Sequence, residues 1–263
     1  MQIHALTTGT VRLKHAFLYA RQNWRRQVDL FLPGEWSDPV PIHCWAVEHA
    51  DRLWLVDTGE TAGVRDIPFA RFDVSSDQEL PGALAGAGLS IDDVDTVVLT
   101  HMHGDHMDGG IHVRGPVLVN EPDLAFTRTP AARIQQRMLH QPIPTGVEFQ
   151  AFTLDAGPFG RFSASRRLSD DGRILAVSTP GHTVGHISVL CVDDDGTHVL
   201  LAGDVSDSEE QLRALRPGGA DAKPKDSITS MRTILAHAEQ HSTVFLPSHD
   251  PETVTRLADR TSL

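Results

Sequence analysis

The stretch that decides the fold runs over residues 100–110 and reads THMHGDHMDGG. It begins where the apolar, β-branched run VDTVVLT (94–100) ends, and such a run predicts a buried strand. Imidazole nitrogens and carboxylate oxygens are both good zinc ligands, and Gly104 lets the backbone turn sharply between them. A cluster of this density directly after a strand predicts a metal site, whose first candidate ligands are His101, His103, Asp105 and His106.

Three later segments repeat this context, with a polar side chain placed at or just after the end of an apolar strand. The segments are STPGHTVGHISVL, VLLAGDV and VFLPSHD, and they contribute His182, Asp204 and His249. A carboxylate at the end of a buried strand, such as Asp204, is costly unless a cation lies close by. These three residues complete a set of seven candidate metal ligands.

Seven ligands are too many for one tetrahedral ion. The set therefore predicts two divalent metal ions, each with three protein ligands, and one carboxylate that bridges them. Asp204 stands apart in the sequence from the other six and is the predicted bridge. Zn²⁺ is the favoured metal, with Mn, Fe or Co as alternatives, and the open coordination positions suit a shared hydroxide.

Composition and charge narrow the class of protein. The chain has 263 residues, of which 40% are hydrophobic, so it can bury a sizeable core. Its net charge of -12 at pH 7 argues against binding nucleic acid or an anionic membrane, because both need a basic surface, and we expect a small-molecule substrate. No apolar run approaches the roughly 20 residues that span a bilayer, and the N-terminus lacks the apolar segment of a secretion signal. Cys44 and Cys191 lie in apolar runs as expected for buried thiols, which fits a cytoplasmic protein.

The pattern of apolar runs predicts strands in two groups, each followed by helices. We expect two strands in 42–56 with a turn at Ala50 and Asp51, a short helix at 79–89, strands at 94–100 and 116–120, a helical segment at 121–141 interrupted near Pro130, further strands from 149 onward, a helix at 226–241, a strand at 243–247 and a closing helix from Pro251. Such an order favours two sheets packed together with helices outside. We treat residues 1–263 as one domain.

Residues 15–40 are the exception to this pattern, because they are rich in aromatic residues and arginine and precede the first clear hairpin. We interpret them as an N-terminal arm or lid over the site, or as a subunit-contact surface that would make the protein a homodimer. In the first case, the arm would line an apolar pocket with Phe17, Trp24, Phe31 and Trp36.

With these motifs in this order, the chain resembles the metallo-β-lactamase-fold hydrolases from about residue 40 to about residue 255. The resemblance implies an α/β protein with an αββα sandwich, in which two mixed sheets carry helices outside and the site lies at one edge between them. It also implies that one metal is held by His101, His103 and His182, the other by Asp105, His106 and His249, and that Asp204 bridges them. The sequence VDTG (56–59) matches another landmark of the family, where Asp57 would orient a ligand histidine.

Within the family, TPGHTVGH, the later aspartate and the final SHD look most like the quorum-quenching N-acyl-homoserine lactonases. The implied activity is the opening of a lactone or ester by a metal-bridging hydroxide, with Asp105 as the proton shuttle. The alternatives are hydrolysis of a phosphoester, thioester or β-lactam, an iron-bearing oxidoreductase, and a metal-binding protein without activity. One departure concerns substrate recognition, because those lactonases often carry a tyrosine three residues after the bridging aspartate. This chain has Asp207 there, and its only tyrosine is Tyr19.

The remaining polar residues are interpreted as structural. His186 is expected to bond to the backbone, Asp108 to be a turn or helix-cap residue, and the polar loop 216–226 to rim the site. Nine other histidines lack a strand-end partner and are predicted to be structural or on the surface: His4, His15, His43, His49, His112, His140, His198, His237 and His241.

Overall fold

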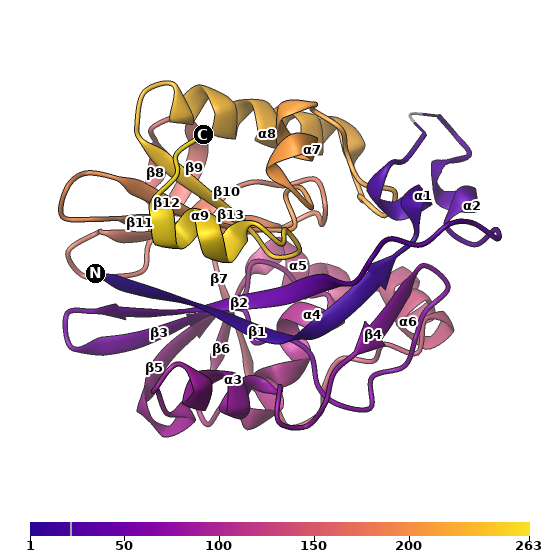
Figure 1. Cartoon of the computed structure of the whole chain (residues 1–263), viewed down its shortest axis with the longest axis horizontal. Helices are drawn as coiled ribbons and strands as arrows, with labels where there is room; N and C mark the ends of the chain where they lie inside the picture. Colours follow the sequence, from indigo (N-terminus) through magenta and orange to yellow (C-terminus); the bar gives the residue numbers. More distant parts are fainter. Residues whose placement is uncertain (22) are drawn as a thin grey trace.

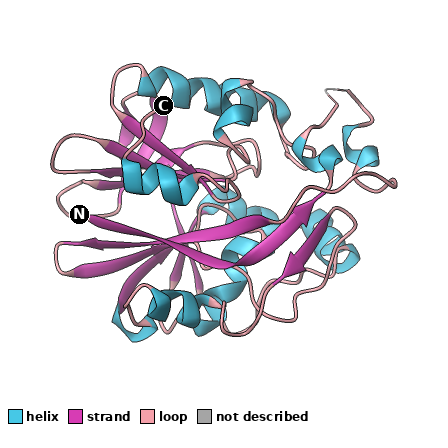
Figure 2. Ribbon diagram, viewed as in Figure 1, coloured by secondary structure: helices cyan, strands magenta, loops and turns pink. Residues whose placement is uncertain are grey.

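Two β-sheets pack face to face in the computed structural model, which describes residues 1–21 and 23–263, and helices cover their outer faces (Figures 1 and 2). In order across the first sheet, the strands are β4 (Ala70–Asp73), β1 (Gln2–Leu13), β2 (Val40–His49), β3 (Arg52–Val56), β5 (Val94–Val98), β6 (Val117–Asn120) and β7 (Phe149–Phe152). The second sheet has the order β13 (Thr243–Pro247), β12 (His198–Gly203), β11 (Ile187–Val192), β10 (Ile174–Ser178), β9 (Phe162–Arg167) and β8 (Gly157–Phe159).

Both sheets mix parallel and antiparallel pairs. In the first sheet β3, β5, β6 and β7 run parallel, whereas β1 pairs antiparallel with β2 and β4. In the second sheet only β12 and β13 are parallel among the paired strands described. The αββα sandwich with two mixed sheets is therefore confirmed.

The helices lie outside the sheets, apart from short pieces near the site and a pair at the N-terminal arm (Figures 1 and 2). They are α1 (His15–Leu18), α2 (Arg26–Asp29), α3 (Leu80–Gly86), α4 (Gly104–Met107), α5 (Glu121–Thr127), α6 (Pro130–Met138), α7 (Glu209–Arg213), α8 (Pro224–Ala238) and α9 (Thr253–Asp259), with 3₁₀ turns at Ile91–Asp93 and Asp108–His112. The predicted break near Pro130 is confirmed, and the Thr129 hydroxyl caps α6 by accepting a hydrogen bond from the Ala132 amide at 3.2 Å.

Strand alternation explains how the core is divided. On β2, Trp45 and Val47 face the second sheet, whereas Cys44 and Ala46 face the other way, in the cluster beneath α3. Cys191 on β11 belongs to the core between the sheets. Both cysteines are free, buried thiols as predicted, and burial raises the pKa of Cys191 to about 12.

The longest strand was not predicted from the sequence. β1 reads QIHALTTGTVRL, and its burial alternates only in part, because it pairs with β2 on one side and reaches β4 only with its last residues. The strands β8 and β9, at one edge of the second sheet, were also not among the individual strands expected, and polar residues such as those of FSASRR suit an edge with one exposed face. Tertiary pairing thus overrides a weak local pattern in these segments.

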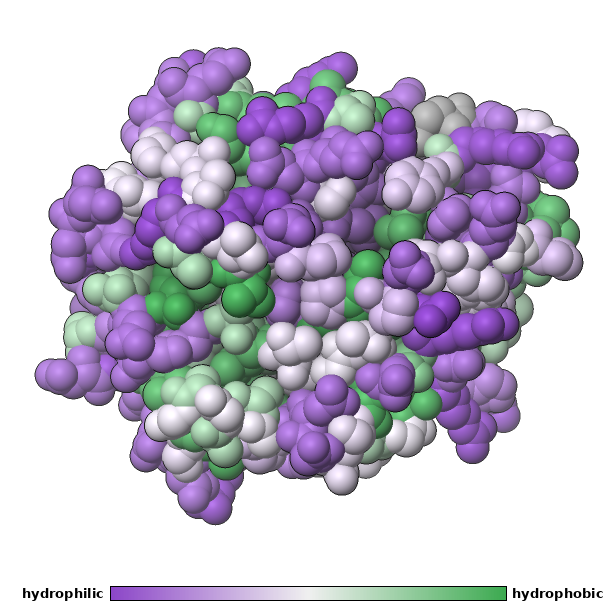
Figure 3. Space-filling view, in the orientation of Figure 1, coloured by the Kyte–Doolittle hydropathy of each residue, from purple (hydrophilic) through white to green (hydrophobic). Residues whose placement is uncertain are grey.

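The face in Figure 3 is mostly hydrophilic, with apolar side chains in scattered patches.

The arm, residues 15–40, is anchored by the buried Lys14, whose Nζ donates to the carbonyl oxygens of Leu30 at 3.0 Å and Leu32 at 2.8 Å. Among the described residues, no helix has both the length and the apolar character needed to cross a bilayer.

Three of the histidines predicted to be structural form a stack beside the second sheet. The rings of His198, His237 and His241 lie with centroids 4.5–5.0 Å apart, and His198 Nδ1 lies 2.8 Å from His237 Nε2. Burial, followed by the charges that His198 and His241 would carry, lowers the pKa of His237 to about 4. Protonation of His237 is therefore unfavourable in the folded protein.

We predict that this stack makes the fold sensitive to acid. The pKa of His237 lies below its ordinary value of 6.5, so its contribution to stability is complete above about pH 6.5 and is lost as the pH falls towards 4. Urea unfolding of the wild type and of His237→Gln between pH 7 and pH 4.5 checks this. The midpoint of the wild type should fall more steeply with pH than that of the variant, and parallel profiles would contradict the prediction.

Candidate metal centre

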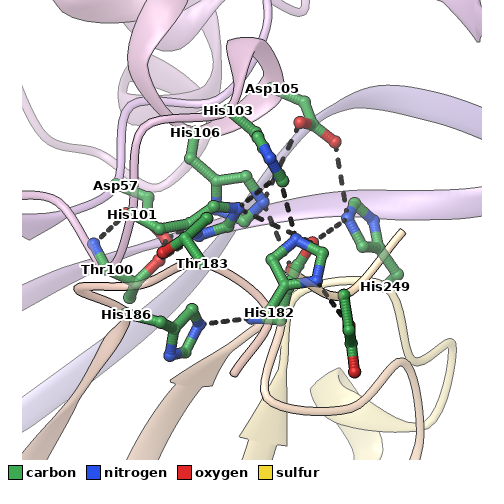
Figure 4. A network of polar contacts seen from close by, with 12 residues as sticks. Asp57, Thr100, His101, His103, Asp105, His106, His182, Thr183, His186 and His249 are labelled. Atoms are coloured by element: carbon green, nitrogen blue, oxygen red, sulfur yellow. Dashed lines mark hydrogen bonds and ion pairs between the residues drawn. The ribbon is translucent and has the colours of Figure 1, made fainter. Parts of the chain in front are cut away.

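The structure brings all seven candidate ligands together at one edge of the sandwich, between the two sheets (Figure 4). Each comes from a loop or short helix that follows a strand: β5, β10, β12 or β13. They form two groups, and the ligand atoms within each group lie within 4.8 Å of one another. The first group is His101, His103, His182 and Asp204, and the second is Asp105, His106 and His249.

Asp204 lies between the two groups. Its Oδ1 is 3.2 Å from His106 Nε2, and its Oδ2 is 3.4 Å from His249 Nε2 and 3.5 Å from His182 Nε2. One carboxylate thus reaches histidines of both groups, as expected for a bridging ligand. The Asp204 side chain is buried, so water screens its charge only weakly.

Hydrogen bonds on the far side of the rings decide which nitrogen faces the centre. Nδ1 of His106 donates to Asp57 Oδ2 at 2.9 Å, and Nδ1 of His249 donates to the carbonyl oxygen of Pro41 at 2.9 Å. A carboxylate or carbonyl oxygen can only accept, so Nδ1 carries the proton and Nε2 of the neutral ring keeps its lone pair. Both lone pairs therefore point to the carboxylates at the centre.

The orientation of the His101 ring is fixed in the same way, through the hydroxyl group of Thr100. The Thr100 hydroxyl donates to Asp57 Oδ2 at 2.8 Å, which leaves its oxygen free to accept from His101 Nδ1 at 3.1 Å. The lone pair of His101 Nε2 therefore also faces the centre. Asp57 is fully buried and accepts a third bond from the Thr100 amide at 2.7 Å. The predicted contact between Asp57 and a histidine of the motif is confirmed.

The donor set fits divalent cations. His103 Nδ1 lies 3.0 Å from His101 Nε2 and 2.9 Å from His182 Nε2, close to the separation of about 3.3 Å that tetrahedral zinc with ordinary Zn–N bonds requires. His106 Nε2 and Asp204 Oδ1 are buried and have no hydrogen-bond partner. Buried atoms of this kind are rarely left without a partner, and a cation between them would supply one.

Burial and neighbouring charges shift the pKa values of the histidines and aspartates of the site. Burial lowers the pKa of His103 to about 3. Burial also lowers the pKa of His106 and His249, but the charge of Asp204 and its neighbours outweighs this and leaves both pKa values well above the usual range. Burial raises the pKa of Asp204, and the two imidazoles outweigh it in the opposite direction. Without metal, protons take the place that cations would occupy.

His186 is structural, as predicted. Its Nδ1 donates to the carbonyl oxygen of Thr179 at 3.0 Å, and its Nε2 accepts from the Asp204 amide at 3.1 Å. The residue before Asp204 is Gly203, which has a left-handed φ of +56°. A Cβ atom there would lie 2.7 Å from the Thr100 hydroxyl oxygen and 2.8 Å from His186 Nε2. The backbone that presents Asp204 therefore requires glycine.

Sequence reasoning missed a carboxylate behind His182. Asp221 Oδ1 accepts from His182 Nδ1 at 3.1 Å, although the loop 216–226 was expected only to rim the site. A single aspartate in a polar loop carries no local signal, because its partner is distant in the sequence. By contrast, none of the nine histidines predicted to be structural belongs to either ligand group in the described chain.

Two further acidic groups lie close to the centre. Asp108 forms the turn between α4 and the following 3₁₀ segment, as predicted, and is not in either ligand group. Burial, followed by the charge of Asp105, raises the pKa of Asp108 to about 7. Burial, followed by the charge of Asp108, raises the pKa of Glu60 to about 9. Glu60 is therefore protonated at neutral pH, so two negative charges do not lie side by side. Sequence reasoning did not identify Glu60.

We predict that Gly203→Ala is strongly destabilising, by about 2–4 kcal/mol, because it combines a left-handed φ with overlap on Thr100 and His186. Gly196→Ala is the matched control, since its φ of +82° is also left-handed but nothing lies within 4 Å of the added atom. The control should cost about 1 kcal/mol. Urea unfolding measures both, and equal losses would mean that the crowding at Gly203 is relieved.

Comparisons with known proteins agree with this geometry. Residues 37–249 match the model of the metallo-beta-lactamase superfamily. The N-acyl homoserine lactonase AttM of Rhizobium radiobacter is 23% identical over 267 residues, which cover 96% of this chain and 94% of the relative. A hydroxyacylglutathione hydrolase of Cupriavidus taiwanensis is 26% identical over 254 residues, covering 81% of this chain and 87% of the relative.

A solved structure has the same fold. It is an N-acyl homoserine lactone hydrolase with the product N-hexanoyl-L-homoserine at its catalytic metal center, and it aligns with a TM-score of 0.75 and 18% identity over 96% of this chain and 94% of that chain. The family model spans most of the sequence and includes all four ligand-bearing segments. The chain belongs to the metallo-beta-lactamase superfamily.

Proposed function

We propose that this protein is a dinuclear metal-dependent hydrolase that opens a lactone or ester, with N-acyl-homoserine lactones as the candidate substrates. The observation that carries the proposal is the position of Asp204 between two histidine groups whose lone pairs converge on it. The proposal is supported by relatives that are named as lactonases. Quorum quenching, a cytoplasmic location and a homodimer stay predictions.

Two Zn²⁺ ions suit the imidazole and carboxylate donors. We assign His101, His103 and His182 to one ion, Asp105, His106 and His249 to the other, and Asp204 to both. Such a pair, when bound, supplies an activated water near neutral pH and polarises the carbonyl group of the substrate. The protein contributes the fixed positions of these donors, because the hydrogen bonds behind His106 and His249, for example, leave the Nε2 atoms of these two rings directed inward.

Asp105 is our candidate for the proton shuttle. Its side chain is 15% exposed, whereas that of Asp204 is 4% exposed, so of the two carboxylates Asp105 is the more accessible from the substrate side. Burial raises the pKa of Asp105, but the charges of His106 and His249 outweigh it and lower the pKa. The carboxylate is therefore ionised at neutral pH and able to accept a proton.

An apolar pocket adjoins the site and suits an acyl group. It touches the centre at His103 and is walled mainly by Met102, Met107, Phe126, Leu139 and Ile143. Three glutamine side chains also line it and can hydrogen-bond an amide: Gln135, Gln136 and Gln141. An apolar wall with a few neutral polar groups fits an N-acyl substrate better than a phosphate ester.

The arm does not form this pocket, contrary to the sequence-based expectation. Of the four aromatic residues expected to line it, Phe31 lines an adjoining groove, which shares Gln135 and Leu139 with the pocket. Phe17 packs instead on Phe69 at a centroid distance of 5.9 Å, and Trp24 is 83% exposed. Helices α5 and α6 and the loops beside them, rather than the arm, provide the wall.

Asp207 stands at the position where the lactonases often carry a tyrosine. Burial, followed by the charge of Asp204, raises the pKa of Asp207 to about 7. The alternative donor, Tyr19, lies over Arg216 at 5.7 Å and is 55% exposed. Recognition of the substrate carbonyl in this chain therefore differs from that of enzymes with a tyrosine at the position of Asp207.

The decisive experiment is a substrate panel on the metal-loaded protein. We expect two zinc ions per chain and proton release from N-acyl-homoserine lactones, detected with a pH dye and abolished by a chelator. Asp204→Asn should lower kcat/KM by at least about a hundredfold and reduce bound zinc, because a ligand of both sites is lost. Asp195→Asn in the exposed turn after β11 is the control and should match the wild type.

Other outcomes of the panel identify the alternatives. Hydrolysis of thioesters without lactone opening would favour the activity in the name of the hydroxyacylglutathione hydrolase relative. Cleavage of p-nitrophenyl phosphates would indicate a phosphoesterase, and bound iron with oxygen uptake would indicate an oxidoreductase. Metal binding without any turnover would refute the enzymatic proposal.

The pocket predicts a chain-length effect. Leu139→Trp should fill the pocket and lower kcat/KM for N-decanoyl-homoserine lactone at least about tenfold, with little change for the N-butanoyl compound, because burial of each methylene contributes about 0.8 kcal/mol. Val254→Trp on α9 is the control, since that residue is an exposed apolar side chain away from the pocket lining. An equal loss for both substrates would exclude the pocket as the acyl site.

A further inference from the structure

The N-terminal arm bonds to two segments that adjoin candidate metal ligands, the loop that contains Asp221 and helix α7. In Figure 1 the loop after α7 reaches the arm beside α1. We propose that the arm is a positioning element for the metal centre, and that Arg26 acts through Asp221 to hold His182 in its ligand orientation. This role is separate from the choice of substrate, and the family match begins only at residue 37, after most of the arm.

The first connection runs from Arg26 to His182. The Arg26 guanidinium donates from one nitrogen to the carbonyl oxygens of Gly218 at 3.1 Å and Gly219 at 2.7 Å. The Gly218 amide in turn donates to Asp221 Oδ2 at 3.0 Å, and Asp221 Oδ1 accepts from His182 Nδ1 at 3.1 Å. Three successive hydrogen-bonded steps therefore link the arm to a candidate ligand.

Close packing leaves this loop little freedom. The Gly219 amide donates to the carbonyl oxygen of Phe17 at 2.6 Å. A Cβ atom at Gly219 would lie 2.2 Å from the carbonyl oxygen of Ala16, a distance that atoms do not adopt. The loop therefore lies directly on the backbone of the arm, and a displacement of the arm is transmitted to Asp221.

A second connection runs from the arm towards Asp204. Gln211 Nε2 donates to the carbonyl oxygen of Leu18 at 3.0 Å, while its Oε1 accepts from the Asp207 amide. Asp207 follows the bridging carboxylate by three residues. The arm thus bonds to the loop whose Asp221 contacts His182 and, through Gln211, to the segment that follows Asp204.

Arg25 provides a natural comparison with Arg26. It is adjacent in the sequence and has the same charge, but its contacts stay within the arm: its Nε lies 3.9 Å from Asp29 Oδ1, and its guanidinium lies 5.9 Å from the Trp24 ring. Burial lowers the pKa of Arg26, and the charge of Asp221 partly offsets this, so Arg26 is also an electrostatic neighbour of Asp221. Removal of either arginine changes the net charge equally.

The test measures zinc affinity by competition with a chromophoric chelator, on the full-length protein and without substrate. Arg26→Ala should weaken the binding of one of the two zinc ions by about 3- to 10-fold, and Asp221→Ala by about 10- to 100-fold, because a group that orients a ligand histidine is lost. Arg26→Lys keeps the charge but loses the guanidinium Nη1 that donates to both carbonyl groups, so it should lie between wild type and Arg26→Ala. Arg25→Ala should match the wild type.

A double variant separates positioning from general destabilisation. If Arg26 acts through Asp221, the double variant Arg26→Ala/Asp221→Ala should bind zinc no more weakly than Asp221→Ala, within about twofold. Additive losses, or equal zinc affinity for Arg26→Ala and Arg25→Ala, would overturn the proposal. So would a loss in Arg26→Ala that affects both zinc ions equally and accompanies a lower thermal midpoint. None of these outcomes depends on whether the protein opens lactones.

Discussion

The structure depends on one constraint, which is that buried imidazole lone pairs and carboxylates converge on Asp204. These groups are out of water, so their charges must be compensated locally, by protons in the metal-free protein and by divalent cations in the metal-bound protein. His106 Nε2 and Asp204 Oδ1 lack hydrogen-bond partners for the same reason. Burying this set without compensating charge would be costly, so the arrangement favours the binding of cations at the centre.

The sandwich satisfies this constraint by presenting every candidate ligand at the end of a strand. Rigid strands bring the side chains to one edge, and a layer of buried groups behind them selects the nitrogen that faces inward. Asp57, His186 and Asp221 belong to this layer and bond, respectively, to His106, the Asp204 amide and His182. Two residues that shape the site have left-handed φ angles, Gly203 at +56° and Asp57 at +62°. Glycine adopts this conformation readily, whereas at Asp57 it is strained.

Features outside the ligand set distinguish this chain from relatives that share it. The pocket beside His103 is walled by α5, α6 and nearby loops, Asp207 stands three residues after Asp204, and the arm bonds to the loop of Asp221 and to Gln211. We propose that these features, rather than the shared ligand motifs, govern the choice of substrate and the strength of metal binding. Such variation is expected when one scaffold serves several reactions.

The sequence by itself determined the ligand set, the strand ends that carry it, the hairpin of β2 and β3, the break before Pro130 and the membership of the family. These signals are local, because each lies within one short segment. Only the tertiary structure decided that β1 is the longest strand, that the pocket is walled by α6 rather than by the arm, and that Asp221 supports His182. In these cases the partners are far apart in the sequence, so no local pattern records the contact, and the packing of distant segments alone brings them together.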